Sequence, residues 1–243
     1  MTRRAVSLLL VAAFAVLAGH PVGAQGTWTG RIRGGFNVGI QADTAGLSQS
    51  FTLTKNVEPA PIAAELAPAG VLLVDGGIVV RVAGNLGAGV SFSSSNHTAD
   101  AEVTASIPHP FFFNRPRAIT GVESVEHKEF ATNVSGVYVV VSRRMDVGVS
   151  GGLSFFRVEK DFVTDVTFTE SFPYDSATFV RAELNRERVS KTGFHLGADL
   201  TWKLGSSWGI GGLVRYSKAS APFSGGALDV GGLQAGGGIR VMY

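Results

Sequence analysis

The stretch LDVGGLQAGGGIRVMY, residues 228–243, changes chemistry from one residue to the next. One set of alternate positions holds Leu233, Ala235, Gly237, Ile239, Val241 and Tyr243, and the other holds Gln234, Gly236, Gly238, Arg240 and Met242. Because the side chains of a β-strand point alternately to its two faces, this pattern predicts a strand that is apolar or small on one face and polar or small on the other. Such a strand, closing the chain on an aromatic residue, is typical of a sheet whose apolar face meets lipid.

The beginning of the chain predicts export. Arg3 and Arg4 precede an apolar run over residues 6–18, and Pro21 and a group of small residues ending at Ala24 follow it. A basic start, a short apolar segment and a small-residue cleavage site make a secretory signal peptide. We expect residues 1–24 to be removed, so that residues 25–243 form the mature domain.

Charge and cysteine content exclude several classes of function. The signal peptide holds two of the 21 basic residues and none of the 19 acidic ones, so the mature chain is formally neutral. No net charge remains to favour nucleic acid, and we expect no nucleic-acid partner. The chain has no cysteine, which excludes disulfides, thiolate metal sites and cysteine nucleophiles. We assign no catalytic, cofactor-binding or metal-binding residue.

The same alternation recurs along the mature chain, as in residues 194–204, where the even positions are apolar and the odd ones are polar or small. Tight turns are expected at 84–85, 143–146 and 205–207, and long loops at 43–69, 108–122, 171–178 and 219–226. The pattern predicts an all-β fold, an eight-stranded antiparallel transmembrane up-and-down β-barrel with short periplasmic turns and long extracellular strands and loops.

In its signal peptide, its strand pattern and its last strand ending in Tyr243, the chain resembles the small eight-stranded outer-membrane barrels of the OmpA, OmpX and OmpW group. The resemblance covers residues 25–243 and is architectural, since no family-specific signature accompanies it. It implies a location in the outer membrane in contact with its lipid. It also implies that the barrel-assembly machinery reads the last strand, with Ile239 and Val241 at alternate positions before Tyr243.

Charged residues gather on one face of the predicted strands, and we interpret them as a network facing the barrel lumen. Its members are Arg31, Arg33, Asp75, Arg81, His195, Asp199, Lys203, Arg215 and Arg240. Side chains fill the interior of an eight-stranded barrel, so we expect these charges to pair largely with one another. Arginine and lysine outnumber aspartate in the set, which indicates a positive lumen. A soluble lipocalin, with its apolar face inside, is the alternative fold.

Aromatic residues are expected to form two girdles at the edges of the lipid-facing band. One girdle is predicted at the periplasmic end, from Trp28, Trp202, Trp208 and Tyr243, and the other at the opposite end, from Phe92, Phe155, Phe194 and Tyr216. Residues 194 to 202 and 208 to 216 each span roughly 20 Å at a strand tilt near 40°. That length is close to the height of an outer-membrane apolar band.

Excess strand length points to a surface outside the membrane. The segments 147–170 and 179–204 are each more than twice the roughly 10 residues that a bilayer requires, so we expect them to project into the medium. The loop of Phe111, Phe112 and Phe113 joins the two strands that precede these segments in the chain. Exposed aromatic side chains are costly unless they meet lipid, the barrel or a partner. We interpret this loop as a candidate binding surface for an extracellular partner.

The sequence therefore predicts a non-enzymatic outer-membrane protein that serves envelope structure or surface interaction. The first alternative is a narrow, porin-like channel for small or hydrophobic solutes. The second is a lipid-modifying enzyme, but the His-x-Ser pair of lipid A deacylase barrels is absent, since no histidine is followed two residues later by serine.

Overall fold

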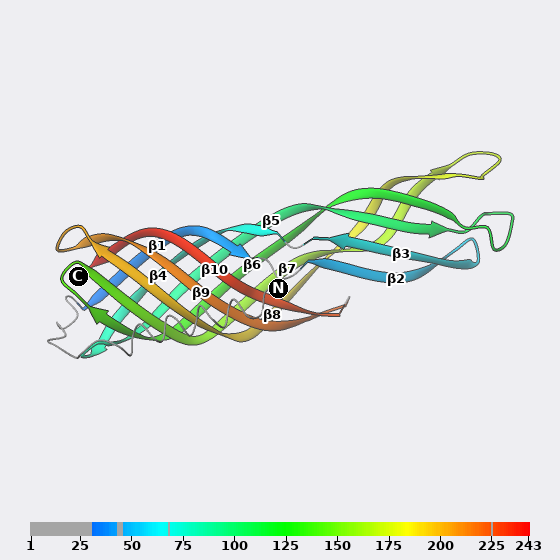
Figure 1. The fold of residues 1–243 in the computed structure, drawn as a ribbon. Coiled ribbons are helices and arrows are strands. Elements are labelled where there is room, and N and C mark those ends of the chain that lie inside the picture. Colours follow the sequence, from blue (N-terminus) through cyan, green and yellow to red (C-terminus); the bar gives the residue numbers. More distant parts are fainter. Residues whose placement is uncertain (1–30, 43–45, 68, 225) are drawn as a thin grey trace, which may run out of the picture.

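The computed structural model describes residues 31–42, 46–67, 69–224 and 226–243, which form ten antiparallel strands (Figure 1). The strands are β1 (Ile32–Ala42), β2 (Leu47–Lys55), β3 (Glu58–Leu66), β4 (Gly70–Ala83), β5 (Leu86–Ile107), β6 (Arg117–Val141), β7 (Met145–Glu170), β8 (Ala177–Lys203), β9 (Trp208–Phe223) and β10 (Gly226–Met242). The predicted signal peptide, residues 1–24, and Trp28 lie outside the described residues. Among those that are described, no helix is long and apolar enough to cross a membrane.

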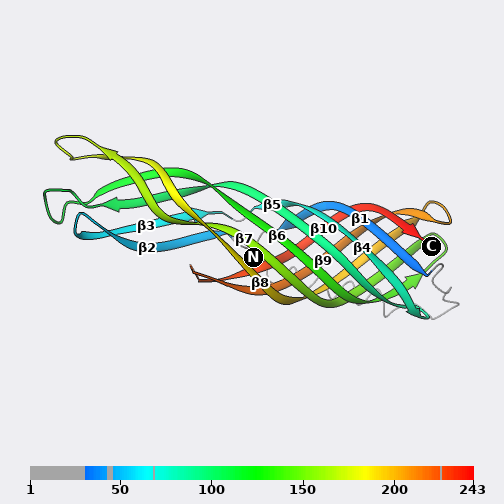
Figure 2. The same cartoon turned by 180° about the vertical axis from the view of Figure 1, so that it is seen from behind.

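Eight of the strands close into a ring. The order runs β1-β4-β5-β6-β7-β8-β9-β10, and β10 returns to pair with β1, as both views show (Figures 1 and 2). Every pairing is antiparallel, and tight turns join β4 to β5, β6 to β7 and β8 to β9 at one end, which we call the turn end. The predicted eight-stranded up-and-down barrel is confirmed.

The expectation of a long loop at 43–69 is wrong, because β2 and β3 form a hairpin there. The hairpin takes the place of β4 beside β5 beyond the point where the pairing of β4 with β5 stops. Residues 62–65 of β3 pair there with residues 102–105 of β5. Pro59 and Pro61 disguise the strand in the sequence, because proline is rare inside a sheet. Both lie just before the part of β3 that pairs with β5, so the pairing with β5 requires no backbone N–H donor at these positions.

The expected long loop at 219–226 is also wrong. Strand β9 continues to Phe223 and β10 begins at Gly226, with residues 222 and 227 paired across the join. Small residues, a proline and consecutive glycines give this segment a loop-like composition. In the structure, residues 219–223 pair with residues 226–230 as the last residues of a hairpin.

Beyond the ring, four strands continue as a long extension with the β2–β3 hairpin beside them (Figures 1 and 2). We call β2, β3 and residues 96–128 and 159–191 the projecting region, and the rest of the ring the barrel region. Gln49 attaches β2 to β7, because its side-chain amide donates to the Val163 carbonyl at 2.7 Å and accepts from the Val163 N–H at 3.1 Å. A salt bridge of 2.8 Å joins Lys55 to Asp165 nearby.

The polarity of the interior and of the exterior is reversed between these two regions. In the barrel region the buried side chains include Asn37, Asp75, Ser93, Asn133 and Arg215, while large apolar side chains are exposed outside. Toward and within the projecting region the interior becomes a continuous apolar core. That core includes Ile62, Val103, Ile107, Ile119, Val125, Phe156, Val158, Phe162, Val163 and Val166.

Candidate functional site

Buried ion pairs join strands across the barrel in the half of the lumen nearer the turn end, which we call the lower lumen. Arg215 on β9 donates to Asp75 on β4 at 2.8 Å, and Asn37 on β1 donates to the same carboxylate at 3.1 Å. Arg215 also reaches the Ser91 hydroxyl at 3.2 Å. These three side chains of Asp75, Asn37 and Arg215 are almost fully buried. A buried charge is costly unless it is paired and hydrogen-bonded, and this arrangement supplies both conditions.

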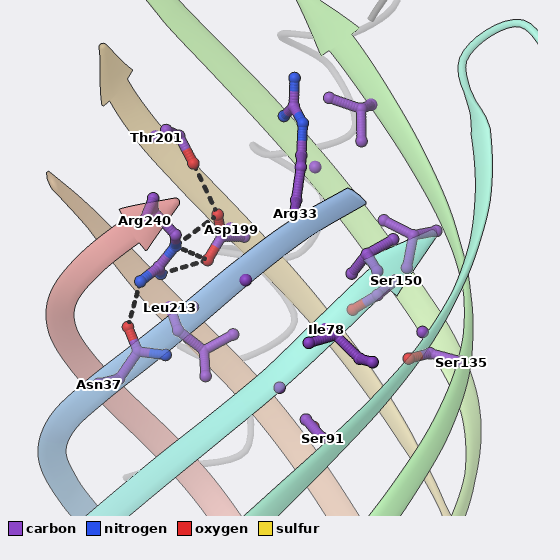
Figure 3. Close-up of a pocket in the computed structure, with 18 of the residues that line it drawn as sticks. Arg33, Asn37, Ile78, Ser91, Ser135, Ser150, Asp199, Thr201, Leu213 and Arg240 are labelled. Atoms are coloured by element: carbon purple, nitrogen blue, oxygen red, sulfur yellow. Dashed lines mark hydrogen bonds and ion pairs between the residues drawn. The ribbon is translucent and has the colours of Figure 1, made fainter. Parts of the chain in front are cut away.

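A second ion pair lies nearer the turn end (Figure 3). The Arg240 guanidinium contacts both oxygens of Asp199 and donates to the Asn37 amide oxygen at 2.7 Å. Thr201 donates to Asp199 at 3.1 Å. Glycine makes room for this long side chain, since a Cβ at Gly35 would lie 3.3 Å from the Arg240 Cδ. Small inward residues and long arginines are therefore complementary parts of one packed interior.

A third cluster closes the turn end, and it centres on an acid that the sequence analysis missed. Asp146 is 1% exposed and accepts from Arg33 at 2.6 Å, while Lys203 lies 2.8 Å away. We expected Asp146 in the turn 143–146, but β7 begins at Met145 and Asp146 points inward. With this acid in place, Arg33, Lys203, Arg215 and Arg240 each have an acidic partner. Arg33 and Lys203 share Asp146, so four cations face three carboxylates and the expected excess of positive charge is reduced to one.

Amide and carboxylate side chains form a layer across the middle of the interior. Gln41 donates to Glu129 at 3.1 Å and accepts from Gln234 at 3.0 Å. Glu129 also accepts the Gly231 N–H at 3.1 Å, and Gln41 donates to the Gly231 carbonyl at 3.0 Å. Gly231 has φ of +95°, a conformation that favours glycine, and a Cβ there would lie 2.5 Å from a backbone oxygen. This layer could not be predicted from the sequence, because amides are common on polar strand faces.

A serine, a histidine and an asparagine meet in the same interior. Ser154 donates to the Asn133 amide oxygen at 2.6 Å and lies 2.9 Å from His195 Nδ1. Ser154 is 0% exposed and its two partners are also buried. The arrangement contains a hydroxyl and an imidazole, but its hydroxyl is committed to Asn133 and no part of it reaches the surface. His195 is therefore a packing and hydrogen-bonding partner in the lumen.

A cavity of about 130 Å³ lies between the ion pairs of the lower lumen (Figure 3). Arg33, Asn37, Ser135, Asp199 and Arg240 line it. Apolar side chains such as Ile78 and Leu213 complete its walls, and its volume is enough for a few water molecules beside the polar groups. The amide layer and the apolar core lie beyond it toward the projecting region. In the described part of the chain, no cluster of three or more metal-ligating side chains is found.

The remaining predicted lumen residues lie at the rim. Arg31 is exposed beside the start of β1, and its carbonyl accepts the Arg81 N–H at 2.9 Å. The side chain of Arg81 is half-buried and has interactions of its own. The structure thus brings seven of the nine predicted residues into the interior or its lower edge, whereas Arg31 and Arg81 mark the turn-end rim.

All the predicted girdle residues within the described part of the chain point outward. They are Phe92, Phe155, Phe194 and Tyr216 toward the projecting region, and Trp202, Trp208 and Tyr243 at the turn end. Phe92 stacks on Phe130, with 6.2 Å between ring centroids, which adds an aromatic residue that the sequence analysis did not include. Trp28 lies outside the described residues. The outer face between the two levels is apolar throughout.

Beyond the aromatic level of Phe155 and Phe194, which we call the upper aromatic level, the outer face of β6, β7 and β8 carries rows of charged residues. We call these rows the charged ladder. Lys128, Glu159 and Arg188 stand in one cross-strand row, with a 2.6 Å salt bridge between Arg188 and Glu159. In the next row Arg186 bridges Asp161 at 2.9 Å and Glu126 at 2.8 Å. The Arg186 guanidinium beside Asp161 holds the pKa of that carboxyl below its usual range. The arginines Arg186 and Arg188 face water, whereas Asp161 is buried.

Three loops meet at the far end of the projecting region and form what we call the tip. They are the β2–β3 turn, the loop 108–116 and the loop 171–176. Arg117 is buried among them and donates to the carbonyls of Pro108 at 2.8 Å and Tyr174 at 3.0 Å, while pairing with Glu170 at 2.5 Å. Asn56 also donates to the Pro108 carbonyl, at 2.9 Å. We had placed Arg117 inside a loop, 108–122, but it begins β6.

The predicted loop residues are the most exposed part of the tip. Phe111 is 69% exposed and Phe113 is 71% exposed, and Phe172 from the neighbouring loop is 85% exposed. Phe112 is also exposed, with the Arg115 guanidinium 5.5 Å from its ring centroid. Phe111 packs edge-on against Tyr174 at 5.4 Å. The structure therefore joins the predicted loop to a second aromatic loop that the sequence analysis did not connect with it.

No protein-family model matches this chain, and no curated protein matches it. Several solved structures resemble its fold. Neisserial surface protein A is 10% identical, with a TM-score of 0.48, over 88% of this chain and 98% of that one. The outer membrane protein OprG from Pseudomonas aeruginosa is 8% identical, with a TM-score of 0.46, over 90% and 98%.

A third similar structure is Ail, the attachment invasion locus protein of Yersinia pestis, in complex with the heparin analogue sucrose octasulfate. It is 10% identical, with a TM-score of 0.40, over 86% of this chain and 99% of that one. These similarities concern the arrangement of strands in an outer-membrane barrel, the class of fold that the sequence resembles.

Proposed function

We propose that this chain is an integral, non-enzymatic protein of the outer membrane. Its barrel region is a closed anchor in lipid, and its projecting region presents an interaction surface outside the cell. The observation that carries the proposal is that the exterior is apolar in the barrel region and charged in the projecting region. An apolar exterior is stable only in an apolar medium, and a charged exterior only in water, so one molecule must cross from one medium to the other.

The outer face of the barrel region supports the lipid contact. Exposed apolar side chains include Phe36, Ile40, Leu72, Ile78, Leu196, Ile210, Val214 and Ile239, and they come from strands all around the ring. In water, a continuous apolar surface of this extent would drive aggregation. Lipid removes that cost, and aromatic residues at both edges suit the two interfaces. The lipocalin alternative would place this face inside, where the structure has charges.

The closed interior favours an anchor over the channel alternative. A solute passing along the barrel would have to break the amide layer of Gln41, Glu129 and Gln234, and then cross the core around Phe156 and Val158. The cavity of about 130 Å³ lies on only one side of these obstacles. A lumen filled by side chains is normal for eight strands.

The non-enzymatic assignment is supported by the burial of the serine and histidine pair. Ser154 and His195 have no surface through which a lipid or peptide could reach them. A nucleophile needs both a free hydroxyl and an accessible substrate position. Neither condition is met in the lumen.

Assembly is proposed to follow the route that the sequence implies. The signal peptide over residues 1–24 would direct export, and the barrel-assembly machinery would read the strand that ends in Tyr243. Tyr243 donates its N–H to the Ile32 carbonyl at 2.9 Å and accepts the Ile32 N–H at 2.8 Å. The last strand therefore makes the contact that closes the ring, which suits a segment that is recognised during insertion.

Labelling of single cysteines tests location and orientation together, because the natural chain has no cysteine. Three variants of the full chain are expressed in a Gram-negative host and treated with a membrane-impermeant maleimide. Thr164→Cys lies in the projecting region, Ile210→Cys in the apolar belt and Ser206→Cys at the turn end. We expect labelling of Thr164→Cys on intact cells, labelling of Ser206→Cys only after the outer membrane is permeabilised, and protection of Ile210→Cys in both cases.

Two results would overturn the proposal. Labelling of Ser206→Cys on intact cells together with protection of Thr164→Cys would reverse the orientation. Ready labelling of Ile210→Cys in a folded protein would show that the belt faces water. Recovery of the protein from the soluble fraction would contradict the membrane location directly.

A further inference from the structure

We propose that the tip inserts its aromatic side chains into the interfacial layer of a second lipid bilayer, opposite the one that holds the barrel. This inference rests on the proposed function, since it assumes that the projecting region points away from the cell. It names the partner of the interaction surface as a phospholipid surface. The residues that enter it are Phe111, Phe112, Phe113 and Phe172.

The first observation is the shape and composition of the tip. Phe113 and Phe172 come from different loops and are more exposed than the girdle residues Phe155 and Phe194, and Val57 on the third loop is as exposed as Phe172. These side chains lie at the far end of the projecting region, on three separate loops. The cavity between the ion pairs of the barrel region does not extend to them. Apolar side chains spread over three loops suit a deformable medium, whereas a protein partner would need a surface shaped to match all three.

The second observation is that several backbone N–H groups of the loop 108–116 donate to side chains of the tip itself. His109 is buried, and its Nδ1 accepts the N–H of Phe111 at 3.1 Å and of Phe112 at 3.2 Å. The Asn114 N–H donates to Glu58 at 3.0 Å. Prolines at 110 and 116 have no N–H to satisfy. A backbone that enters an apolar layer must satisfy its polar groups internally, and the N–H groups of Phe111, Phe112 and Asn114 are already satisfied in this way.

The third observation concerns charge. The charged groups of the tip are paired within it, since Arg117 contacts Glu170 at 2.5 Å and Arg115 lies 4.0 Å from Asp175. Arg115 also lies over Phe112, and its largely exposed side chain places the guanidinium where a headgroup layer would lie. No cluster of unpaired basic residues is present in the described part of the tip. Apolar insertion, rather than attraction to anionic lipid, is therefore the source of binding, and a zwitterionic lipid suffices.

The fourth observation is the reach of the projecting region. From Phe194 at the upper aromatic level to Ala177 at the start of β8, the strand rises roughly 40 Å at about 3.3 Å per residue and a tilt near 40°. The tip therefore stands well above its own bilayer. The charged ladder between them keeps the sides of the projecting region in water.

The experiment uses the full-length mature protein in lipid nanodiscs, mixed with separate phosphatidylcholine vesicles and centrifuged on a density gradient. Co-flotation of discs with vesicles measures binding. The test variant is Phe113→Ser with Phe172→Ser, and the matched control is Val122→Ser with Leu184→Ser, which removes exposed apolar side chains from the flank of the projecting region. Insertion into the discs is established first, so a failure of the membrane anchor is recognised before any vesicle is added.

We expect the natural protein and the control to float with the vesicles, and the test variant to lose at least about tenfold in partitioning. A Phe113→Trp variant should show a blue shift, and brominated lipid in the vesicles should quench the fluorescence that this variant adds. Equal flotation of the test variant, or no flotation of correctly inserted natural protein, would overturn the proposal. Binding only to anionic vesicles at low salt, or only between protein-bearing discs, would also overturn it, in favour of electrostatic adsorption or self-association.

Discussion

The barrel region and the projecting region share the same strands but reverse their chemistry. Along β5 the odd-numbered positions point inward at both ends. In the barrel region these positions hold glycine and serine, such as Gly89 and Ser93, whereas further along they hold Ala101, Val103 and Ile107. The pleat fixes which residues share a face, and the medium outside selects their chemistry. One sheet can therefore enclose a polar interior in the barrel region and an apolar interior in the projecting region.

The two interiors are stabilised in different ways. Ion pairs and amides fill the barrel region, and each buried charge depends on its partner. Packing of apolar side chains fills most of the projecting region, although Arg117 and Lys160 are buried in it. Ion pairs such as Arg188 with Glu159 lie on its outer face, where a single pair contributes little. Equivalent substitutions should therefore have effects of very different size on the stability of the two regions.

The largest expected difference concerns the removal of one partner of an ion pair. Arg215→Ala leaves Asp75 buried in the lumen without its guanidinium, and we expect it to destabilise the barrel by about 3–5 kcal/mol. The matched variant Arg188→Ala breaks the exposed pair with Glu159 and should cost about 0–1 kcal/mol. Urea unfolding of protein refolded into lipid bilayers, followed by Trp202 and Trp208 fluorescence, measures both. Similar losses for the two variants would mean that the interiors do not differ as described.

The second comparison places the same charge on the two outer faces. Val214→Arg puts a guanidinium in the middle of the apolar belt and should cost about 2–4 kcal/mol. Val122→Arg puts one on the water-facing side of the projecting region, where we expect a change within about 0.5 kcal/mol. Both positions hold an exposed valine on a strand, so propensity and size are matched. The same unfolding assay applies, and a neutral effect of Val214→Arg would remove the evidence for a belt in lipid.

Much of the barrel could be predicted because alternation is a local signal. The start of β5 at Leu86, the turn at Gly84 and the outward position of Trp202 all follow from the pattern of residues along one strand. The hairpin of β2 and β3 could not be predicted in the same way. Its position depends on where β4 stops pairing with β5, and that register is a property of the folded sheet.

The site was predicted unevenly for a similar reason. Long cations inside strands are conspicuous, so Arg33, Arg215 and Arg240 were found from the sequence. Asp146 was missed because an acid beside a run of charges reads as a turn residue, and its inward direction depends on a strand boundary that moved by two residues. The link from Phe113 to Phe172 was missed because it joins two loops that only the folded projecting region brings together.

The smallest expected effect is a pH dependence confined to the projecting region. The Arg186 guanidinium lowers the pKa of Asp161 in the folded protein, whereas the unfolded chain has the ordinary value near 4. A lowered folded-state pKa means that the stabilisation is present above about pH 4 and is lost as the pH falls through the lower, folded-state value. The change should be small, because the guanidinium of Arg186 is half-exposed and screened by water. A fluorophore on Thr164→Cys, followed in urea at pH 6 and pH 3, reports this region, and Asp161→Asn should reduce the difference between the two midpoints. An unchanged difference in Asp161→Asn would assign the acid sensitivity to other carboxylates of the charged ladder, such as Glu126, whose pKa Lys128 lowers.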